Sequence, residues 1–192
     1  MTLVIFLDGV HGVGKTTVKN EVAKRLQNAG LRVYSFPEMS YYPDIEIGSL
    51  EFQLWFKNDI AIRDEAIKHL ETTGLVDVIL VDRHYSSIEL YTEYVKHGEE
   101  ATVKWMFDNL DLEPYHILIH LDRSNESIRA SVKERIEREP HRAEWNEDDD
   151  DYLYKIKNLF YSVRFSKWVK SIRADKFEDT CDTVITLIYN NI

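Results

Sequence analysis

The chain has 192 residues, of which 44% are hydrophobic and 12% aromatic, and its formal net charge is −10. This length and apolar content are typical of a folded domain and exclude a disordered or low-complexity chain. The negative charge argues against polymeric nucleic acid as a partner, because a protein surface that binds nucleic acid needs clustered Lys and Arg side chains. A small anion held in one local basic pocket remains compatible with the composition.

The sequence carries no mark of export or of membrane insertion. Its single cysteine, Cys181, cannot form an internal disulfide and is expected to pack in the core. The apolar start at residues 2–7 lacks a basic leader, so we expect no signal peptide. No stretch approaches the roughly 20 apolar residues of a membrane span. We therefore expect a soluble, cytoplasmic protein with no membrane partner.

Apolar runs alternate with helical patterns along the chain. In chain order, we expect a strand at 3–7, a helix at 15–28, a strand at 31–36, a helix at 49–73, a strand at 76–81, helices at 86–97 and 99–110, a strand at 117–121, helices at 124–138 and 151–169, a weak strand at 171–174 and a helix at 178–190. The helix at 49–73 is expected to bury its leucines and isoleucines Leu50, Leu54, Ile60, Ile67 and Leu70. This order predicts an α/β fold, a three-layer sandwich with a five-stranded parallel sheet, formed as a single domain over residues 1–192.

The segment Gly9-Val-His-Gly-Val-Gly-Lys-Thr16 matches the phosphate-binding pattern G-x-x-x-x-G-K-[ST]. It lies between the first expected strand and the first expected helix, which is the context that this pattern requires. Backbone N–H groups of such a loop hold phosphate oxygens, the lysine reaches the β- and γ-phosphates, and the threonine hydroxyl ligates Mg²⁺. The expected ATP-binding residues are Gly9, Val10, His11, Gly12, Val13, Gly14, Lys15, Thr16 and Thr17. His11 is expected to contribute its backbone.

Two more motifs follow expected strands. Asp82-Arg83-His84 ends the third strand, where the carboxylate can orient Mg²⁺ and the guanidinium can hold a substrate phosphate or hydroxyl. The alternative is an aspartate that caps a helix beside a surface arginine. Glu38 follows the second strand and could accept the proton of an attacking hydroxyl, or could be a solvated loop residue. Because carboxyl ends of parallel strands share one edge of the sheet, these motifs predict a common site.

A polar, acidic segment at about 138–150 is expected to form a short lid. Four arginines precede it or belong to it: Arg129, Arg135, Arg138 and Arg142. Lid arginines can offset transition-state charge and exclude water, whereas the alternative is pairing with neighbouring glutamates on a helix surface. The acidic run from Glu147 to Asp151 is expected to be a solvated lid tip rather than a metal site.

Taken together, the motifs resemble those of the deoxynucleoside kinase and thymidylate kinase superfamily, and most closely those of herpesvirus-type thymidine kinases. The resemblance is carried by residues 7–17, Pro37-Glu38 and Asp82-Arg83-His84, with Phe52-Gln53 between them. It implies a P-loop NTPase-like kinase fold. It also implies an enzyme that transfers the γ-phosphate of ATP to the 5′-hydroxyl of a pyrimidine deoxynucleoside, with Mg²⁺ as cofactor.

The resemblance also implies roles for single residues. Glu38 would deprotonate the 5′-hydroxyl, Arg83 would hold the 5′-oxygen, and Asp82 would help to place Mg²⁺. Arg138 and Arg142 would be lid arginines and Phe177 would stack on the adenine of ATP. Gln53 would read the base and Glu144 would bind the sugar 3′-hydroxyl, with Trp55 or Phe56 stacking nearby. Independently of the resemblance, Tyr41 follows Glu38 and is a candidate substrate-binding residue, with packing on the surface or in the core as the alternative.

The chain departs from these families in two ways. It is much shorter than herpesvirus thymidine kinases, and Met39 stands where thymidylate kinases have an arginine that grips a substrate monophosphate. The second departure favours a nucleoside acceptor. Two alternatives remain, a thymidylate-type nucleoside monophosphate kinase and a non-catalytic nucleotide sensor. The helices at 49–73 and 86–110 could form a homodimer face or pack into the core.

Overall fold

The computed structural model describes residues 2–38, 44–45, 49–98, 116–140, 142, 147–167 and 170–192. The elements in chain order are β1 (Leu3–Asp8), α1 (Lys15–Asn28), β2 (Val33–Phe36), α2 (Leu50–Thr73), β3 (Val78–Asp82), α3 (Tyr85–His97), β4 (His116–Asp122), α5 (Asn125–Arg138), α6 (Asp150–Lys167), β5 (Lys170–Arg173) and α7 (Phe177–Tyr189). The expected helix at 99–110 lies outside the described residues. The other expected elements are present, including the weak last strand, with small shifts of their bounds.

The strands form one parallel sheet in the order β2-β3-β1-β4-β5. β1 and β3 are buried along their whole length, as their continuous runs of Val, Ile and Leu require. In the register of β1 with β3, Leu7 lies opposite Asp82. The loops that follow these two strands therefore leave the sheet at the same edge, together with the loop that follows β2.

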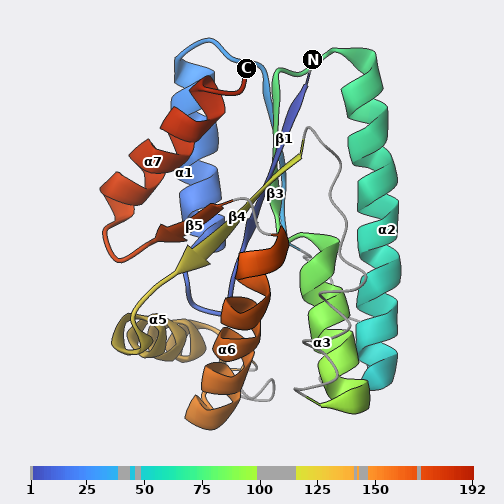
Figure 1. Ribbon diagram of the computed structural model, residues 1–192, viewed down its shortest axis with the longest axis vertical. Coiled ribbons are helices and arrows are strands. Elements are labelled where there is room, and N and C mark those ends of the chain that lie inside the picture. Colours follow the sequence, from blue (N-terminus) through green and yellow to red (C-terminus); the bar gives the residue numbers. More distant parts are fainter. Residues whose placement is uncertain are drawn as a thin grey trace.

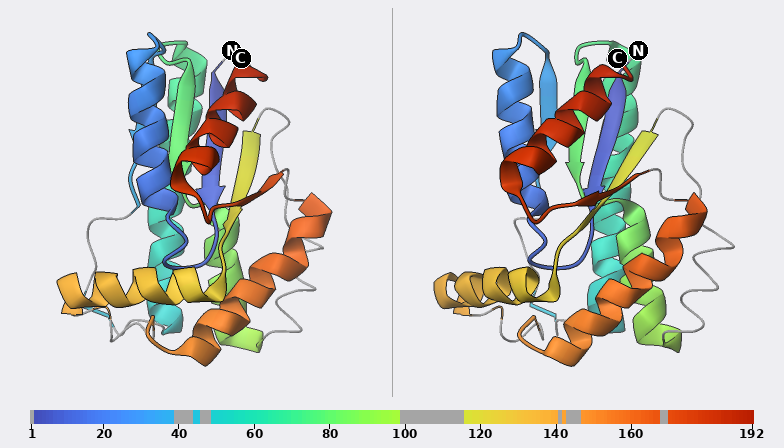
Figure 2. Two further views of the ribbon diagram at one scale, coloured as in Figure 1. Left: turned by 90° about the vertical axis from the view of Figure 1, so that its left-hand side faces the viewer. Right: turned by 60° about the vertical axis from the view of Figure 1, so that its left-hand side comes forward.

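Helices cover both faces of the sheet, which confirms the predicted three-layer sandwich. α1 and α7 lie on one face, and α2 and α3 lie on the other (Figure 1). α5 and α6 lie beyond the carboxyl ends of the central strands, below the loop that joins β1 to α1 (Figure 2). Ser124 begins α5 as its sequence predicts, with its hydroxyl accepting a hydrogen bond from the backbone N–H of Ser127. None of the helices in the described part of the chain is long and apolar enough to cross a membrane.

The buried face of α2 differs from the prediction. Ile60 and Ile67 are buried as expected, but Leu50 and Leu54 are 39% and 48% exposed. At 3.6 residues per turn, these leucines lie roughly 80–140° around the helix from the two isoleucines, so one helix face cannot bury all four. The prediction that Cys181 packs in the core is confirmed, because the residue is fully buried.

Candidate functional site

The loop between β1 and α1 depends on two glycines. Gly9 and Gly12 have φ angles of 140° and 72°, which residues other than glycine rarely adopt. A Cβ at Gly9 would lie 2.5 Å from the carbonyl oxygen of Leu121, and one at Gly12 would lie 2.7 Å from a methyl group of Val132. The loop is therefore packed against the end of β4 and against α5, and its backbone is held in place.

A cavity of about 600 Å³ lies over this loop. Residues 12–18 line it, together with Arg135 and Arg138 of α5 and Phe177 at the start of α7. This is ample space for a nucleotide, and we call it the donor cleft. The structure thus brings most of the predicted ATP-binding residues to one cavity. Gly9, Val10 and His11 do not line it.

Lys15 lines the donor cleft and is almost completely buried. Its Nζ donates hydrogen bonds to the carbonyl oxygens of Gly9 (3.0 Å) and Val10 (3.1 Å). Burial and the nearby positive charge of Arg83 lower the pKa of Lys15 to about 8, against the opposing effect of neighbouring carboxylates. The ammonium group therefore begins to lose its proton in mildly alkaline solution.

This pKa predicts a pH dependence of ATP binding. A bound triphosphate favours the charged lysine and raises its pKa, so the Kd should be constant below about pH 8 and rise above it by up to about tenfold per pH unit. Isothermal titration calorimetry at about pH 7 and about pH 9.5 measures this. A Lys15→Arg variant keeps its charge over that range and serves as the control. An equal Kd at both pH values in the unmodified protein would contradict the prediction.

Thr16 and Asp82 form a pair that fits a divalent cation. The Thr16 hydroxyl donates to Asp82 Oδ2 (2.6 Å), and Asp82 is completely buried at the end of β3. Its other oxygen, Oδ1, has no hydrogen-bond partner among the described residues. Lys19 Nζ lies 3.9 Å from Oδ2. A buried carboxylate oxygen without a partner beside a threonine hydroxyl suits the oxygen ligation that Mg²⁺ prefers.

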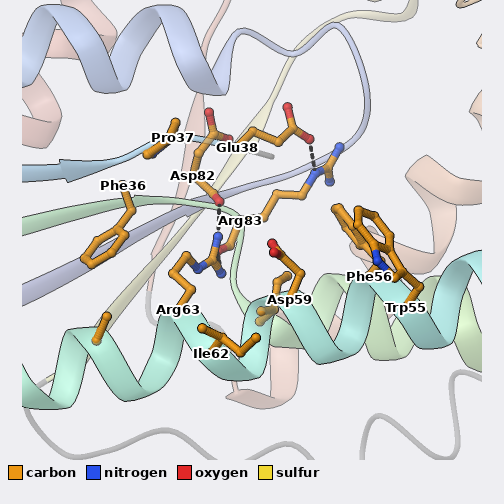
Figure 3. Close-up of a pocket in the computed structure, with 12 residues that line it drawn as sticks. Phe36, Pro37, Glu38, Trp55, Phe56, Asp59, Ile62, Arg63, Asp82 and Arg83 are labelled. Carbon is orange, nitrogen blue, oxygen red and sulfur yellow. Dashed lines mark hydrogen bonds and ion pairs between the residues drawn. The ribbon is translucent and has the colours of Figure 1, made fainter. Parts of the chain in front are cut away.

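Glu38 and Arg83 meet at the carboxyl ends of β2 and β3. Arg83 Nε donates to Glu38 Oε1 over 2.7 Å (Figure 3). Burial alone would raise the pKa of Glu38, but the charges of Arg83 and Lys15 outweigh it and hold that pKa well below its usual range. Glu38 is therefore ionised at neutral pH, which is the form that can accept a proton.

The guanidinium of Arg83 is fixed from several sides. It donates to the carbonyl oxygen of Gly9 (3.3 Å) and lies 3.4 Å from Nδ1 of His11. The backbone of Arg83 has a φ of 68°, a left-handed conformation that is rare for residues other than glycine. Asp8 stabilises this turn, because its buried carboxylate accepts hydrogen bonds from the backbone N–H groups of Gly9 and His84. Sequence reasoning did not assign a role to Asp8.

A second cavity, of about 360 Å³, lies between α2 and the ends of β2 and β3. Glu38 and Arg83 line it at the strand ends, and Trp55, Phe56 and Asp59 line it from α2 (Figure 3). We call it the acceptor cavity. Of the described residues, Glu38 is the one that lines both this cavity and the donor cleft.

Gln53, the predicted reader of a base, does not line the acceptor cavity. It is buried on α2 but is not among the residues that line the cavity, although Ile60, seven residues later on the same face of the helix, does line it. Tyr41 and Glu144, the two other predicted substrate-binding residues, lie outside the described residues. The structure therefore brings Glu38 and Arg83 to this cavity and not Gln53.

Two arginines at the site were missed by sequence reasoning. Arg63 of α2 donates to the backbone carbonyl oxygens of Asp82 and Arg83, at 2.8 Å each, and so fixes the turn after β3. Arg123 lines the donor cleft and donates to the Ser131 hydroxyl (3.0 Å). A signal for Arg123 was present, because the Asp-Arg pair that follows β3 is repeated after β4.

The predicted lid arginines have different surroundings. Arg138 lines the donor cleft, and its side chain is 69% exposed beside Glu134. Arg129 pairs with Asp150 at 2.6 Å, outside the donor cleft. Arg142 is buried and its Nη1 donates to Glu147 Oε1 over 3.2 Å. Arg142 therefore contacts its own segment in this structure rather than the donor cleft.

The prediction that Glu147 is a solvated lid tip is wrong. Its side chain is fully buried, and Oε1 lies 3.2 Å from Nδ1 of His11. Burial raises the pKa of Glu147, but its hydrogen bond to His11 and the nearby arginine charges lower it to about 2. The aspartates of the same run, residues 148–151, are exposed as expected. The side chain of His11 thus joins the loop to the lid segment, a contact that its sequence position did not reveal.

No family model matches the chain. It is similar to a probable adenylyl-sulfate kinase of Archaeoglobus fulgidus, with 28% identity over 108 residues, which cover 54% of this chain and 65% of that protein. The match thus spans slightly less than two thirds of that relative's length. The structure resembles that of a deoxyadenosine kinase from M. mycoides with products dCMP and a flexible dCDP bound, at a TM-score of 0.63 and 17% identity over 98% of this chain and 100% of that one. The fold is that of the P-loop kinases, as the sequence predicts.

Proposed function

We propose that the chain is an ATP-dependent phosphotransferase that transfers the γ-phosphoryl group of ATP to the 5′-hydroxyl of a deoxynucleoside. The position of Glu38 on the wall of both cavities carries this proposal. A carboxylate paired with a guanidinium thus stands where a bound triphosphate and a bound acceptor would meet. A protein that only senses nucleotides has no need of this pair. The likeness to two kinases supports the same class of reaction.

On the donor side, the backbone of residues 12–17 would bind the phosphates and Lys15 would contact the β- and γ-phosphates. Phe177 would stack on the adenine. Arg138 would approach the phosphates from α5, and Arg142 would do so when the segment at about 138–150 closes. Residues 1–192 would act as one kinase domain, either alone or as a homodimer.

Thr16 and Asp82 would hold Mg²⁺, consistent with the Asp82 oxygen that lacks a partner among the described residues. When bound, the ion supplies charge neutralisation on the β- and γ-phosphates. Lys19 would keep the Asp82 carboxylate in place from beneath.

On the acceptor side, Glu38 would accept the proton of the 5′-hydroxyl. Its Oε1 is bound to Arg83, while Oε2 has no hydrogen-bond partner among the described residues. The acceptor O–H bond breaks toward Glu38 as the new O–P bond forms, and the bond between the γ-phosphorus and the β,γ-bridging oxygen breaks to release ADP. Arg83 would hold the acceptor oxygen and offset the developing charge.

The charge of the acceptor cavity favours a neutral acceptor. Its described lining residues include three carboxylates, Glu38, Asp59 and Asp82, and two guanidinium groups, Arg63 and Arg83. Both guanidinium groups already donate hydrogen bonds, to the backbone or to Glu38. A nucleoside monophosphate or adenylyl sulfate would bring further negative charge into a lining that already holds one more carboxylate than guanidinium groups.

A panel of acceptors tests the proposal. With ATP and Mg²⁺, initial rates are measured in a coupled assay for ADP with deoxynucleosides, deoxynucleoside monophosphates and adenylyl sulfate. We expect kcat/KM for the best deoxynucleoside to exceed that for any anionic acceptor by at least about tenfold, because each anion must enter a cavity of net negative charge. A preferred monophosphate or adenylyl sulfate would overturn the assignment, and ADP formation with none of them would favour a sensor with slow hydrolysis.

A further inference from the structure

Asp59 is the carboxylate that α2 presents to the acceptor cavity, beside the aromatic pair Trp55 and Phe56 and one turn before Arg63. It points from the helix toward the strand ends, between Arg63 and the ring of Phe56 (Figure 3). Gln53 lies six residues earlier, which places it about 120° away around the helix axis. A molecule in this cavity would therefore meet Asp59 and not Gln53.

The carboxylate of Asp59 is available to a ligand. It is half-buried, and among the residues that the structure describes it forms no hydrogen bond or ion pair. Arg63 lies on the same face of the helix, but its Nη1 and Nη2 donate to the carbonyl oxygens of Asp82 and Arg83. Arg63 is thus held by the backbone through these two nitrogens and forms no ion pair with Asp59.

The surroundings of Asp59 specify the chemistry of its partner. The ring centroids of Trp55 and Phe56 lie 6.5 Å apart, and both rings line the cavity, so a planar ring system can pack against them. An ionised carboxylate only accepts hydrogen bonds. Cytosine and adenine present an exocyclic amino group as a donor, whereas the matching position of uracil, thymine and hypoxanthine is a carbonyl oxygen, which a carboxylate repels.

We propose that Asp59 selects acceptors whose base carries an amino group at C4 of a pyrimidine or C6 of a purine, by accepting a hydrogen bond from that group. This inference rests on the proposed function, because it assumes that a nucleoside occupies the acceptor cavity with its 5′-hydroxyl near Glu38. Nucleosides of cytosine and adenine should therefore be better acceptors than thymidine, in contrast to the thymidine kinases whose motifs the sequence resembles.

Two pairs of near-isosteric nucleosides test the proposal. Deoxycytidine and deoxyuridine differ in one substituent, amino against carbonyl, and in the proton on the adjacent ring nitrogen, as do deoxyadenosine and deoxyinosine. We expect the amino-bearing member of at least one pair to be favoured in kcat/KM by roughly 10- to 100-fold, the range for a hydrogen bond to a charged group. In Asp59→Asn, whose amide can donate as well as accept, this ratio should fall to within about threefold of unity with kcat for deoxyuridine or deoxyinosine retained.

Two controls separate a specificity role from a structural one. Glu51→Gln removes an exposed carboxylate from the same helix and should leave the ratio unchanged. Gln53→Ala tests the rival reader of the base. Direct binding of the four nucleosides, measured by calorimetry without ATP, should follow the same order as kcat/KM.

Each outcome decides a different point. The proposal is overturned if the unmodified protein prefers the carbonyl-bearing nucleosides, if Asp59→Asn folds and keeps the ratio, or if Gln53→Ala changes the ratio and Asp59→Asn does not. If no nucleoside binds or reacts but an anionic acceptor does, the proposed function fails and the role of Asp59 fails with it. Turnover of nucleosides without base preference would leave the proposed function standing and reject this inference alone.

Discussion

Glu38→Gln is expected to lower kcat by about 10²- to 10⁴-fold and to leave the Kd for ATP within about twofold of the unmodified protein. The amide fits the same space and can still contact Arg83, but it cannot accept the proton of the acceptor hydroxyl. Glu38 lines the donor cleft as well as the acceptor cavity, but the backbone N–H groups and Lys15 that would bind the phosphates are unchanged in this variant. Single-turnover kinetics and ATP titration measure the two quantities separately.

Glu134→Gln is the matched control for this variant. Glu134 also lines the donor cleft, but it lies exposed on α5 beside Arg138 and has no contact with the acceptor cavity among the described residues. Its kcat should stay close to that of the unmodified protein. A Glu38→Gln protein with near-normal kcat would show that another group takes the proton, and the assignment of the base would have to be withdrawn.

Arg83→Gln is expected to lower kcat by about 10²- to 10³-fold, the usual effect of removing one group that stabilises transition-state charge. It should also introduce a loss of activity at acidic pH. Burial raises the pKa of Glu38 and the charge of Arg83 is the largest effect that opposes it, so without Arg83 this pKa moves upward. Activity then falls as Glu38 becomes protonated at lower pH. The pH profile of kcat between about pH 5.5 and about pH 8 measures this.

Arg83→Lys separates charge from geometry. The lysine keeps the positive charge near Glu38, so no new acidic limb should appear, but it cannot hold Glu38 and the Gly9 carbonyl oxygen with the same fork of donors. The effects of Arg83→Gln and Glu38→Gln should also be far from additive, since the two side chains are bonded directly to each other. Additive effects with unchanged pH profiles would contradict a shared role.

The sequence predicted the sheet and its helices because their local signals agree. The short apolar runs of β1 and β3 are typical of strands buried on both faces, and the glycine pattern between β1 and Lys15 predicts the turn that joins β1 to α1. The failure on α2 has a geometric cause. The leucines and isoleucines of α2 lie on two different faces of the helix, and the buried face includes Phe52 and Gln53 instead of Leu50 and Leu54.

The candidate site could be predicted only where it follows strand ends. The alternation of elements predicts that the carboxyl ends of the strands share one edge, and Glu38 and Arg83 meet there because β2 and β3 are neighbours in the sheet. The contacts of Arg63 and Glu147 depend on how α2 and the segment before α6 approach the strand ends, and no local pattern encodes that approach. Their charges looked like ordinary surface charges in the sequence, as did that of Asp59.

The identity of the phosphorylated product tests the central claim most directly. The protein is incubated with ATP, Mg²⁺ and deoxycytidine or deoxyadenosine, and the products are examined by phosphorus NMR. The account predicts a 5′-monophosphate ester of the nucleoside and an equal amount of ADP, with both signals strongly reduced in Glu38→Gln. ADP together with inorganic phosphate alone, or phosphate transferred only to an acceptor that already carries a phosphate or sulfate group, would contradict it.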